Sequence, residues 1–558
     1  MDSQILTYLV AGAGAAGAAA AAARRLRLSG AKHPSLAGHA RISTLIARLI
    51  PFYGFGEGRF FSSDGARPDV ARRREMAFEA LARDYEHRFV NTIALKAEIK
   101  DTVSDLQFTD VYRVPYQYSR LVRERLGGGP LLQSSHGVML TDVDGNTYYD
   151  LAGSYGVNLF GYDFYKACIE RAVARVGELG PVLGALHPIV AYNVKRLREI
   201  SGLDEVSFHM SGTEAVMQAV RLARYHTGRR RIVRFCGAYH GWWGDVQPGV
   251  GNPMPARETY TLADMSEKSL RVLETRRDIA CVLVNPSQAM HPNAPAPGDS
   301  ALIDSSRRAG FDRAAYAAWL QRLREVCRRR GIILILDEIF VGFRLAPGGA
   351  QEYFGVRADI VTYGKSLGGG LPVGVVCGAR CYMKRYRDDR PVDVCFARGT
   401  FNAHPYVMAA MHEFLLQMET PQIKALYAGL DDTWNVRTNE LNHRLEARAL
   451  PVRIANMSSI WTVFYTRPSR YNWMLQYYLR REGLALSWIG TGRLIFSLNY
   501  TAEDFEAVAS RFVAAAEAMA QDGWWWEDDS EARRPSIKRQ VLYEMLSHRF
   551  PIFAGVRR

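Results

Sequence analysis

Short apolar runs alternate with helix-length segments through the middle of the chain. Five such runs are flanked by turn residues: EVSFHMSG, RIVRFCG, IACVLVNP, GIILILDEIF and DIVTYGKS. Several are apolar at consecutive positions, which is typical of strands that are buried on both faces. Strands that alternate with helices predict a sheet covered by helices. We therefore expect an α/β fold with a mostly parallel central sheet.

The pattern changes on both sides of this region. Residues 72–100 contain no Pro or Gly and carry apolar side chains at near-helical intervals, which predicts helix. Two apolar runs flank Asp144-Gly145, a strong hairpin signal. After Tyr406, helical stretches give way to β-prone runs and a final helix. The expected organisation is an Ala-rich segment at 1–23, a helical extension at 24–110, the first part of a small α+β domain at 111–164, a large domain at 165–405, the rest of the small domain at 406–520 and a tail at 521–558.

The Ala-rich segment contains two patterns that suggest opposite functions. Gly12-x-Gly14-x-x-Gly17 matches the dinucleotide-binding fingerprint, but no acidic residue follows until Glu57, where the fingerprint needs one about 20 positions on. Residues 5–23 carry no charge, yet only four are strongly apolar, so membrane insertion would be marginal. A peripheral membrane anchor and an Ala-rich packing helix both remain open. A cleaved signal peptide fits poorly, because the basic residues follow the apolar run.

Charge and cysteine content narrow the class of protein. The formal net charge is +14, and residues 24–49 hold six basic residues and no acidic one, but no nucleic-acid-binding module is present. The seven cysteines are scattered and lack paired zinc-site spacing. We expect a reduced, cytoplasmic protein without a metal site and without nucleic acid as a partner.

Polar residues follow three of the predicted strands. Ser211-x-x-Glu214 is a capping box, so Ser211, Gly212 and Thr213 lie where a helix N-terminus favours an anion; an ordinary capped helix is the alternative. Asp337 ends an apolar strand, where a buried carboxylate needs a cationic partner: an arginine, a metal or a protonated heterocyclic nitrogen.

Lys365 supplies the third feature. A lysine in a dry pocket near a cationic ring has its neutral form favoured, which makes it a nucleophile able to form a Schiff base. An anion site, a carboxylate for a ring nitrogen and an imine-forming lysine together indicate pyridoxal 5′-phosphate. Tyr239 and His240 follow another strand, where a ring could stack on this cofactor or simply fill a loop.

Taken together, these residues resemble the class III aminotransferases among the fold-type I pyridoxal-phosphate enzymes, in particular the glutamate-1-semialdehyde aminomutase branch. The resemblance covers about residues 112–520 and rests on SGTEAV, F.G.YHG, DEI..GFR, GKSLGGGLPVG and GTF..HP in that order. It implies that Lys365 carries the cofactor and shuttles the α-proton, and that Asp337 binds the pyridine nitrogen. It also implies a homodimer, in which Thr400 reaches the phosphate of the partner subunit. The implied cofactor contacts are Ser211, Gly212, Thr213, Tyr239, His240, Gln288, Asp337, Ile339, Lys365 and Thr400, with Tyr239 also in the catalytic set.

Two departures bear on the substrate. Asn285-Pro286 replaces the usual Glu-Pro, which leaves Gln288 as the candidate contact to the ring hydroxyl. Residues 153–163 look more like aminotransferase domains of polyketide or peptide assembly lines, which favours a keto or aldehyde group on a long acyl chain or thioester. The candidate substrate contacts are Ser119, Arg120, Arg123 and Tyr155.

The expected reaction is transfer of an amino group from an amino donor to a keto or aldehyde acceptor. An intramolecular aminomutase is the first alternative. A membrane-bound scaffold that has lost the chemistry is the second, and the presence of Lys365 and Asp337 speaks against it.

Overall fold

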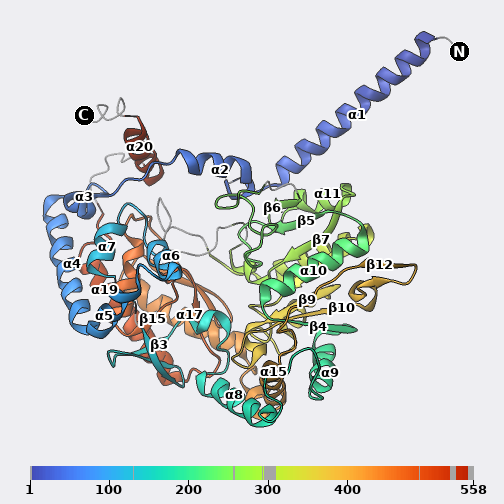
Figure 1. The fold of residues 1–558 in the computed structure, drawn as a ribbon. Coiled ribbons are helices and arrows are strands. Elements are labelled where there is room, and N and C mark those ends of the chain that lie inside the picture. Colours follow the sequence, from blue (N-terminus) through green and yellow to red (C-terminus); the bar gives the residue numbers. More distant parts are fainter. Residues whose placement is uncertain are drawn as a thin grey trace.

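The computed structural model describes residues 3–34, 36–127, 129, 131–254, 258–291, 293, 309–488, 490–527 and 536–550. Its centre is a seven-stranded sheet in the order β4-β10-β9-β8-β7-β5-β6 (Figure 1). The strands are β4 (Glu205–His209), β5 (Arg231–Phe235), β6 (Thr259–Leu262), β7 (Ile279–Val284), β8 (Ile333–Asp337), β9 (Ile360–Gly364) and β10 (Gly374–Gly378). Only β10 runs antiparallel to its neighbours in this sheet. The mostly parallel sheet expected from the consecutive apolar runs is therefore confirmed.

Alternate residues of the central strands serve two separate cores. Ile333 and Ile335 of β8 pack with α10 (Gly212–Thr227), whereas Leu334 and Leu336 pack with α12 (Arg313–Arg330) on the other face. Because side chains alternate across a strand, only an uninterrupted apolar run can fill both cores. The remaining helices of this region are α8 (Tyr162–Val176), α9 (Val190–Ser201), α11 (Glu267–Thr275), α13 (Gly349–Phe354), α14 (Arg380–Met383) and α15 (Pro405–Gln417).

A second layer combines the two flanks of the sequence. The hairpin expected at Asp144-Gly145 is present, and its strand β3 pairs in parallel with the distant β15. This sheet contains β1 (Leu132–His136), β2 (Met139–Asp142), β3 (Thr147–Asp150) and β15 (Leu484–Ala485). A further sheet contains β13 (Val452–Met457), β14 (Ile460–Tyr465) and β16 (Leu494–Ile495), and a two-stranded ribbon contains β11 (Tyr386–Arg387) and β12 (Arg390–Val394). The accompanying helices are α16 (Pro421–Ala425), α17 (Leu430–Ala447), α18 (Leu475–Arg481), α19 (Ala502–Gln521) and α20 (Ile537–Arg549).

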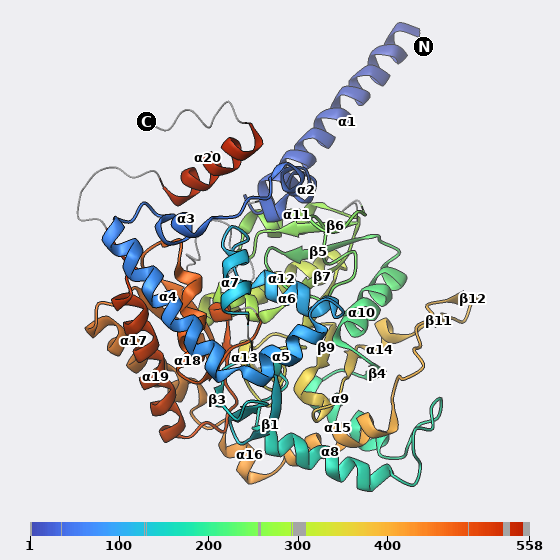
Figure 2. The same cartoon turned by 60° about the vertical axis from the view of Figure 1, so that its left-hand side comes forward.

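The N-terminal extension is helical, as its pattern predicts. The helices of the first 112 residues are α1 (Ser3–Ala31), α2 (Ala40–Leu49), α3 (Glu57–Ser62), α4 (Pro68–Arg88), α5 (Val90–Ile99) and α6 (Ser104–Tyr112), and α7 (Ser119–Arg125) follows in the first part of the small domain. Helices α4 and α5 lie along the small-domain layer, and α1 projects away from the body (Figures 1 and 2). The glycine fingerprint lies inside α1, with no strand before it, so the dinucleotide hypothesis has no structural basis. Within the described residues, no helix has the length and apolarity to cross a membrane.

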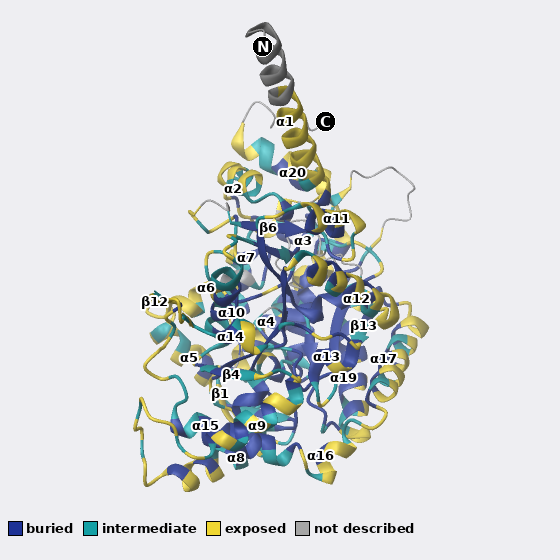
Figure 3. Cartoon of the chain, turned by 90° about the vertical axis from the view of Figure 1, so that its right-hand side faces the viewer, coloured by how far each residue is buried: buried dark blue, intermediate teal, exposed yellow. Residues whose placement is uncertain are grey.

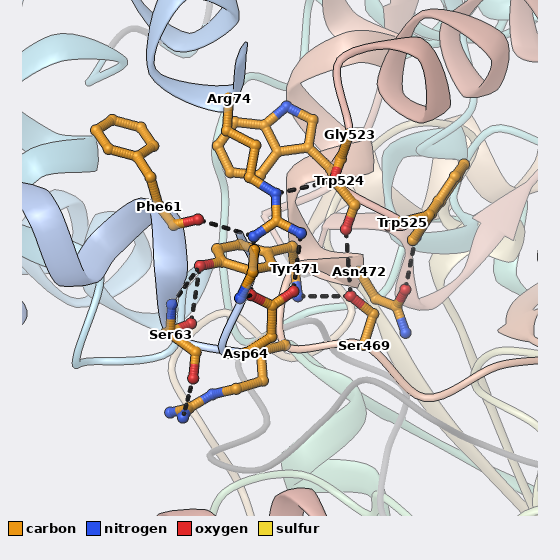
Figure 4. A network of polar contacts seen from close by, with 12 residues as sticks. Phe61, Ser63, Asp64, Arg74, Ser469, Tyr471, Asn472, Gly523, Trp524 and Trp525 are labelled. Carbon is orange, nitrogen blue, oxygen red and sulfur yellow. Dashed lines mark hydrogen bonds and ion pairs between the residues drawn. The ribbon is translucent and has the colours of Figure 1, made fainter. Parts of the chain in front are cut away.

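The extension is joined to the far end of the chain by one buried guanidinium. Arg74 is fully buried, donates to both carboxylate oxygens of Asp64 at 2.9 and 2.8 Å, and donates from Nε to the Gly523 carbonyl at 2.8 Å (Figure 4). Its guanidinium also lies over the ring of Tyr471, 4.4 Å from the centroid. Trp524 is buried beside it. Trp524, the first of three consecutive tryptophans, is therefore part of a core that ties residues 61–74 to residues 471–525.

Candidate active site

Four segments meet at the carboxyl edge of the central sheet. Gly212 follows β4, His240 follows β5, Asp337 ends β8 and Lys365 follows β9. These four strands run parallel, so their carboxyl ends share one edge, where α/β proteins place their ligands. A cavity of about 370 Å³ opens there. It is lined by Val157, Met210, Ser211, Gly212, Thr213, Val216, Tyr239, His240, Gly241, Asn285, Asp337, Ile339, Phe340, Lys365, Gly370, Leu371, Pro372 and Val373.

One wall of the cavity is the N-terminus of α10. Ser211 is the N-cap residue, and its hydroxyl accepts a hydrogen bond from the Glu214 amide at 3.2 Å. The amides of the first helical turn have no partner inside the helix and attract an anion. A Cβ at Gly212 would come within 2.8 Å of the Ile339 Cδ1 atom, so only glycine fits between the helix and this side chain. The wall therefore forms a tight cradle for an anionic group.

The opposite wall carries a buried carboxylate that is held from both sides. Asp337 Oδ2 lies 2.7 Å from His240 Nδ1, and Oδ1 accepts from the Thr362 hydroxyl and the Ile339 amide, both at 3.3 Å. Thr362 can do this because it pairs directly with Asp337 in the β8–β9 register. Both Asp337 and His240 are buried, which makes such partners necessary. His240 Nε2 has no hydrogen-bond partner among the described residues.

Lys365 points into the cavity from a strained turn. Its φ of 48° lies in the left-handed region, which costs a non-glycine residue about 1–3 kcal/mol. Its Nζ donates to the Tyr155 carbonyl at 2.5 Å and lies 5.1 Å from the Phe340 ring centroid. Burial lowers the pKa of Lys365 to about 8; the Asp337 carboxylate opposes this shift, and Arg344 and Arg493 add to it. The amine is therefore neutral far more often than an exposed lysine.

Arg344 fixes the segment that Lys365 contacts. Its Nη2 donates to the Gly156 and Asn158 carbonyls at 3.3 and 2.9 Å, and its Nη1 donates to the Phe496 carbonyl at 2.6 Å. Arg344 thus joins the segment after β8, the loop at 153–158 and the end of the small domain. Burial lowers its pKa to about 10. The loop adopts left-handed conformations at Ser154 and Tyr155, which this clamp helps to maintain.

Most predicted cofactor residues come together, and two do not. Ser211, Gly212, Thr213, Tyr239, His240, Asp337, Ile339 and Lys365 all line the cavity. Gln288 does not: its Nε2 donates to the Cys236 carbonyl at 2.6 Å, and Asn285 occupies the cavity wall instead. Thr400 is exposed and lies outside the cavity of its own chain.

The predicted substrate residues are mostly displaced from the cavity. Ser119 is buried and donates its hydroxyl to the Tyr116 carbonyl, Arg123 donates to the Ser119 carbonyl, and Arg120 is exposed. None of the three lines the cavity. Tyr155 contacts Lys365, but through its backbone oxygen. The Ser119 and Arg123 side chains instead donate to backbone carbonyls in or next to helix α7.

Sequence reasoning missed several residues that shape the site. Phe340 lies beneath Lys365, Asn285 lines the wall, and Arg344 clamps the loop. The Arg493 guanidinium lies 5.3 Å from the Phe340 ring centroid, although Arg493 is distant from Lys365 in the sequence. Arg344 ends the motif DEI..GFR, and the motif could have indicated its role, since a buried arginine after a strand must find several carbonyl partners. Nothing local signals Arg493.

Comparison with known proteins places the chain in a family. A family model described as aminotransferase class-III matches residues 130–252 and 300–516. The glutamate-1-semialdehyde 2,1-aminomutase of Alkaliphilus oremlandii is 36% identical over 319 residues, which is 53% of this chain and 69% of that protein. The protein of the same name from Nitratidesulfovibrio vulgaris is 34% identical over 335 residues, 59% of this chain and 75% of that protein.

Solved structures agree on the fold. A transaminase with pyridoxal phosphate bound superposes with a TM-score of 0.59 at 25% identity, covering 75% of this chain and 98% of the other. A glutamate-1-semialdehyde aminomutase from Pseudomonas aeruginosa superposes with a TM-score of 0.65 at 20% identity, covering 80% of this chain and 99% of the other. At 20% identity the second likeness shows a shared fold. The fold-type I architecture expected from the motifs is confirmed.

Proposed function

Because the chain belongs to the class III aminotransferases and is a pyridoxal-phosphate-dependent enzyme, we propose that it transfers an amino group from an amino donor to a keto or aldehyde acceptor. One observation carries this proposal. The Lys365 amine, the Asp337 carboxylate and the open N-terminus of α10 line a single cavity at the carboxyl edge of the sheet. These are the three groups that a Schiff-base cofactor with a ring nitrogen and a phosphate requires.

The residues present fit the cofactor. The amides at Gly212 and Thr213 would hold its phosphate, Asp337 would hold its ring nitrogen, and Lys365 would bond to its aldehyde. The unpartnered Nε2 of buried His240 also supports a ligand here, since buried polar atoms are normally satisfied. When bound, pyridoxal phosphate supplies an aldehyde that accepts the amino group and a ring that delocalises the electrons left by proton removal.

The chain's own residues divide the remaining work. Lys365 Nζ takes up and returns the substrate proton, for which a pKa near 8 is suited at neutral pH. Asp337 stays fixed in orientation because His240 and Thr362 hold its two oxygens. The Tyr239 ring lines the cavity, where it can stack on the cofactor and exclude water.

A homodimer completes the proposal. Thr400 is exposed and does not line the cavity of its own chain, as is expected of a residue that serves a partner's site. The surrounding segment exposes Val392, Phe396 and Phe401, with 95%, 69% and 49% of their surface accessible. Large exposed apolar side chains mark an interaction surface. Mixing a Lys365→Ala chain with a Thr400→Val chain tests this: mixed dimers regain one complete site, and no regained activity in verified mixed dimers would contradict sharing.

The reaction itself can be tested without knowing the natural substrate. Holoenzyme incubated with a panel of amino donors and no acceptor is expected to release about one equivalent of keto product per site, measured by mass spectrometry. Lys365→Ala is expected to release none. Borohydride reduction followed by peptide mapping should place the cofactor on the Lys365 peptide. An unmodified peptide in cofactor-saturated protein would rule the proposal out.

The aminomutase remains the second candidate, because both relatives described above carry that name. A mutase moves the amino group within one molecule and needs neither donor nor acceptor. The proposed transferase is expected to stop after about one turnover with an amino-aldehyde alone. Many turnovers under these conditions would select the aminomutase.

A further inference from the structure

Helix α2 turns its apolar face towards solvent. Ile42, Leu45 and Leu49 recur at intervals of three and four residues, so they share one face, and they expose 51%, 60% and 54% of their surface. Phe52 follows them and is 79% exposed. No residue of α2 is buried. An amphipathic helix of a globular protein normally buries this stripe.

The side of α2 that approaches the body carries small residues. The Ser43 Oγ and Ala40 Cβ atoms lie 3.3 and 3.6 Å from where a Cβ on Gly249 would be, so this side of the helix rests on the loop at 249. The Ser43 and Thr44 hydroxyls both donate to the Ala40 carbonyl, at 2.8 and 2.9 Å. Ile46 is half-buried, whereas the stripe described above stays exposed.

Basic residues surround this apolar stripe. The chain has 57 acidic residues among 558, yet none between Ser3 and Gly56. Leu26, near the end of α1, is 74% exposed, and α2 lies beside the base of α1 (Figures 1 and 2). Figure 3 shows the described part of α1 as mostly exposed and α2 as exposed or half-buried. The exposed basic side chains of this surface are Arg24, Arg25, Arg27, Arg41 and Arg48.

Charge decides what this surface binds. A two-fold contact between copies of the chain would place one set of these arginines against the other, and like charges across an interface are unfavourable. Nucleic acid would neutralise the arginines but offers no apolar environment for three aliphatic side chains and a phenylalanine. An anionic bilayer satisfies both requirements, because it presents negative headgroups above an apolar interior.

We propose that α2, together with Phe52 and the base of α1, docks this enzyme on anionic membrane surfaces. The face that docks is defined by Leu26, Ile42, Leu45, Leu49 and Phe52 with the five arginines around them. This proposal does not rest on the proposed reaction. It also differs from an anchor within residues 5–23, because the apolar contact comes from α2.

Vesicle co-sedimentation of the full-length holoenzyme tests the proposal. Wild type is expected to bind phosphatidylcholine vesicles that contain phosphatidylserine at least tenfold more tightly than phosphatidylcholine alone. Binding should weaken in about 1 M salt, where charges are screened beyond about 3 Å. Leu45→Glu/Leu49→Glu and Arg41→Glu/Arg48→Glu should each weaken binding at least tenfold. Both pairs are exposed, so circular dichroism and melting temperature should stay at the wild-type values.

A matched control separates the surface from net charge. Arg171→Glu/Lys195→Glu makes the same change in charge at exposed positions of α8 and α9, at the opposite end of the molecule. It should bind vesicles like wild type. Equal loss in this control, equal binding to both vesicle types, or no binding by wild type would overturn the proposal. A fall in oligomer mass for Leu45→Glu/Leu49→Glu, without vesicle binding by wild type, would instead assign the face to a second copy.

Discussion

His240 Nδ1 lies 2.7 Å from Asp337 Oδ2, and both side chains are excluded from solvent. A carboxylate only accepts hydrogen bonds, so the imidazole donates from Nδ1 and its tautomer is fixed when the ring is neutral. Because Thr362 holds the other oxygen, the carboxylate has one orientation. His240 therefore positions Asp337, while its ring also lines the cavity.

Replacing His240 should weaken the cofactor site through Asp337. His240→Leu leaves a buried carboxylate oxygen without its donor, which costs about 1–3 kcal/mol, so cofactor affinity is expected to fall about tenfold or more. His240→Asn keeps a donor near the Nδ1 position and should recover most of this affinity. Equilibrium dialysis measures both values. Equal affinity in the two variants would show that the ring, and not its hydrogen bond, matters.

Lys365 should react with amine reagents at unusually low pH. With a pKa of about 8, roughly one tenth of its amines are neutral at pH 7, against roughly one in 3,000 for an ordinary lysine. Labelling the cofactor-free enzyme with an acylating reagent and mapping the Lys365 peptide should give a midpoint near pH 8. The peptide of exposed Lys195, mapped in the same samples, serves as the internal control. A shared midpoint would contradict the burial argument.

The same shift predicts a pH-dependent stability in the cofactor-free enzyme. The folded state binds the Lys365 proton less tightly than the unfolded state, so unfolding takes up a proton between about pH 8 and pH 10.5. The cost of burying the charge is complete below pH 8 and disappears as the pH rises through this window. Lys365→Met should therefore stabilise the protein most near pH 7, and denaturant titrations should show this advantage shrinking by pH 10.

Gly212 should tolerate no side chain. A methyl group there would lie 2.8 Å from Ile339 Cδ1, so Gly212→Ala must push Ile339 into the cavity or move α10. We expect cofactor affinity to fall at least about tenfold, or about 1.4 kcal/mol. Gly58→Ala is the control, since a Cβ at this position in α3 has nothing within 4 Å. Unchanged affinity in Gly212→Ala would mean that the cradle lies elsewhere.

Arg74 should be essential for stability although it is remote from the site. Arg74→Met removes the partner of half-buried Asp64 and all four hydrogen bonds of a fully buried guanidinium, so the free energy of unfolding should fall by about 3 kcal/mol. Arg67 forms a comparable pair with Asp69 at 3.2 Å, but that pair is exposed. Arg67→Ala should change the free energy of unfolding by less than about 1 kcal/mol. Similar losses in both variants, measured by chemical denaturation, would contradict this account.

The sequence predicted the features that depend on local pattern. Consecutive apolar residues mark strands buried on both faces, and a parallel arrangement then brings Asp337 and Lys365 to one edge. The direction in which a side chain of a turn points depends on contacts with residues that are distant in the sequence. Gln288 lies in a 3₁₀ segment, Pro286–Met290, and Asn285 caps its start; only the packed structure shows that Asn285 faces the cavity.

The hydrophobic pattern of the sequence could not predict hydrogen bonds between distant segments. Arg344 bonds to carbonyls that lie 152 and 186 residues away, and no periodicity encodes such pairs. The pattern of the sequence indicates no role for Trp524, because it packs between Arg74 of the N-terminal extension and Tyr471 of the small domain, both distant in the sequence. In α2, the helical period is clear, but the period alone cannot tell which environment covers its apolar stripe.

The hydrogen bond from Arg74 to Gly523 spans 449 residues, which has a consequence for biosynthesis. Arg74 has local partners in Asp64 and the Phe61 carbonyl, but the acceptor of its Nε is added to the chain only 449 residues later. Contacts of such sequence separation form late, and intermediates that lack them expose apolar surface. The N-terminal extension can therefore complete its packing only after residues 471–525 have been synthesised.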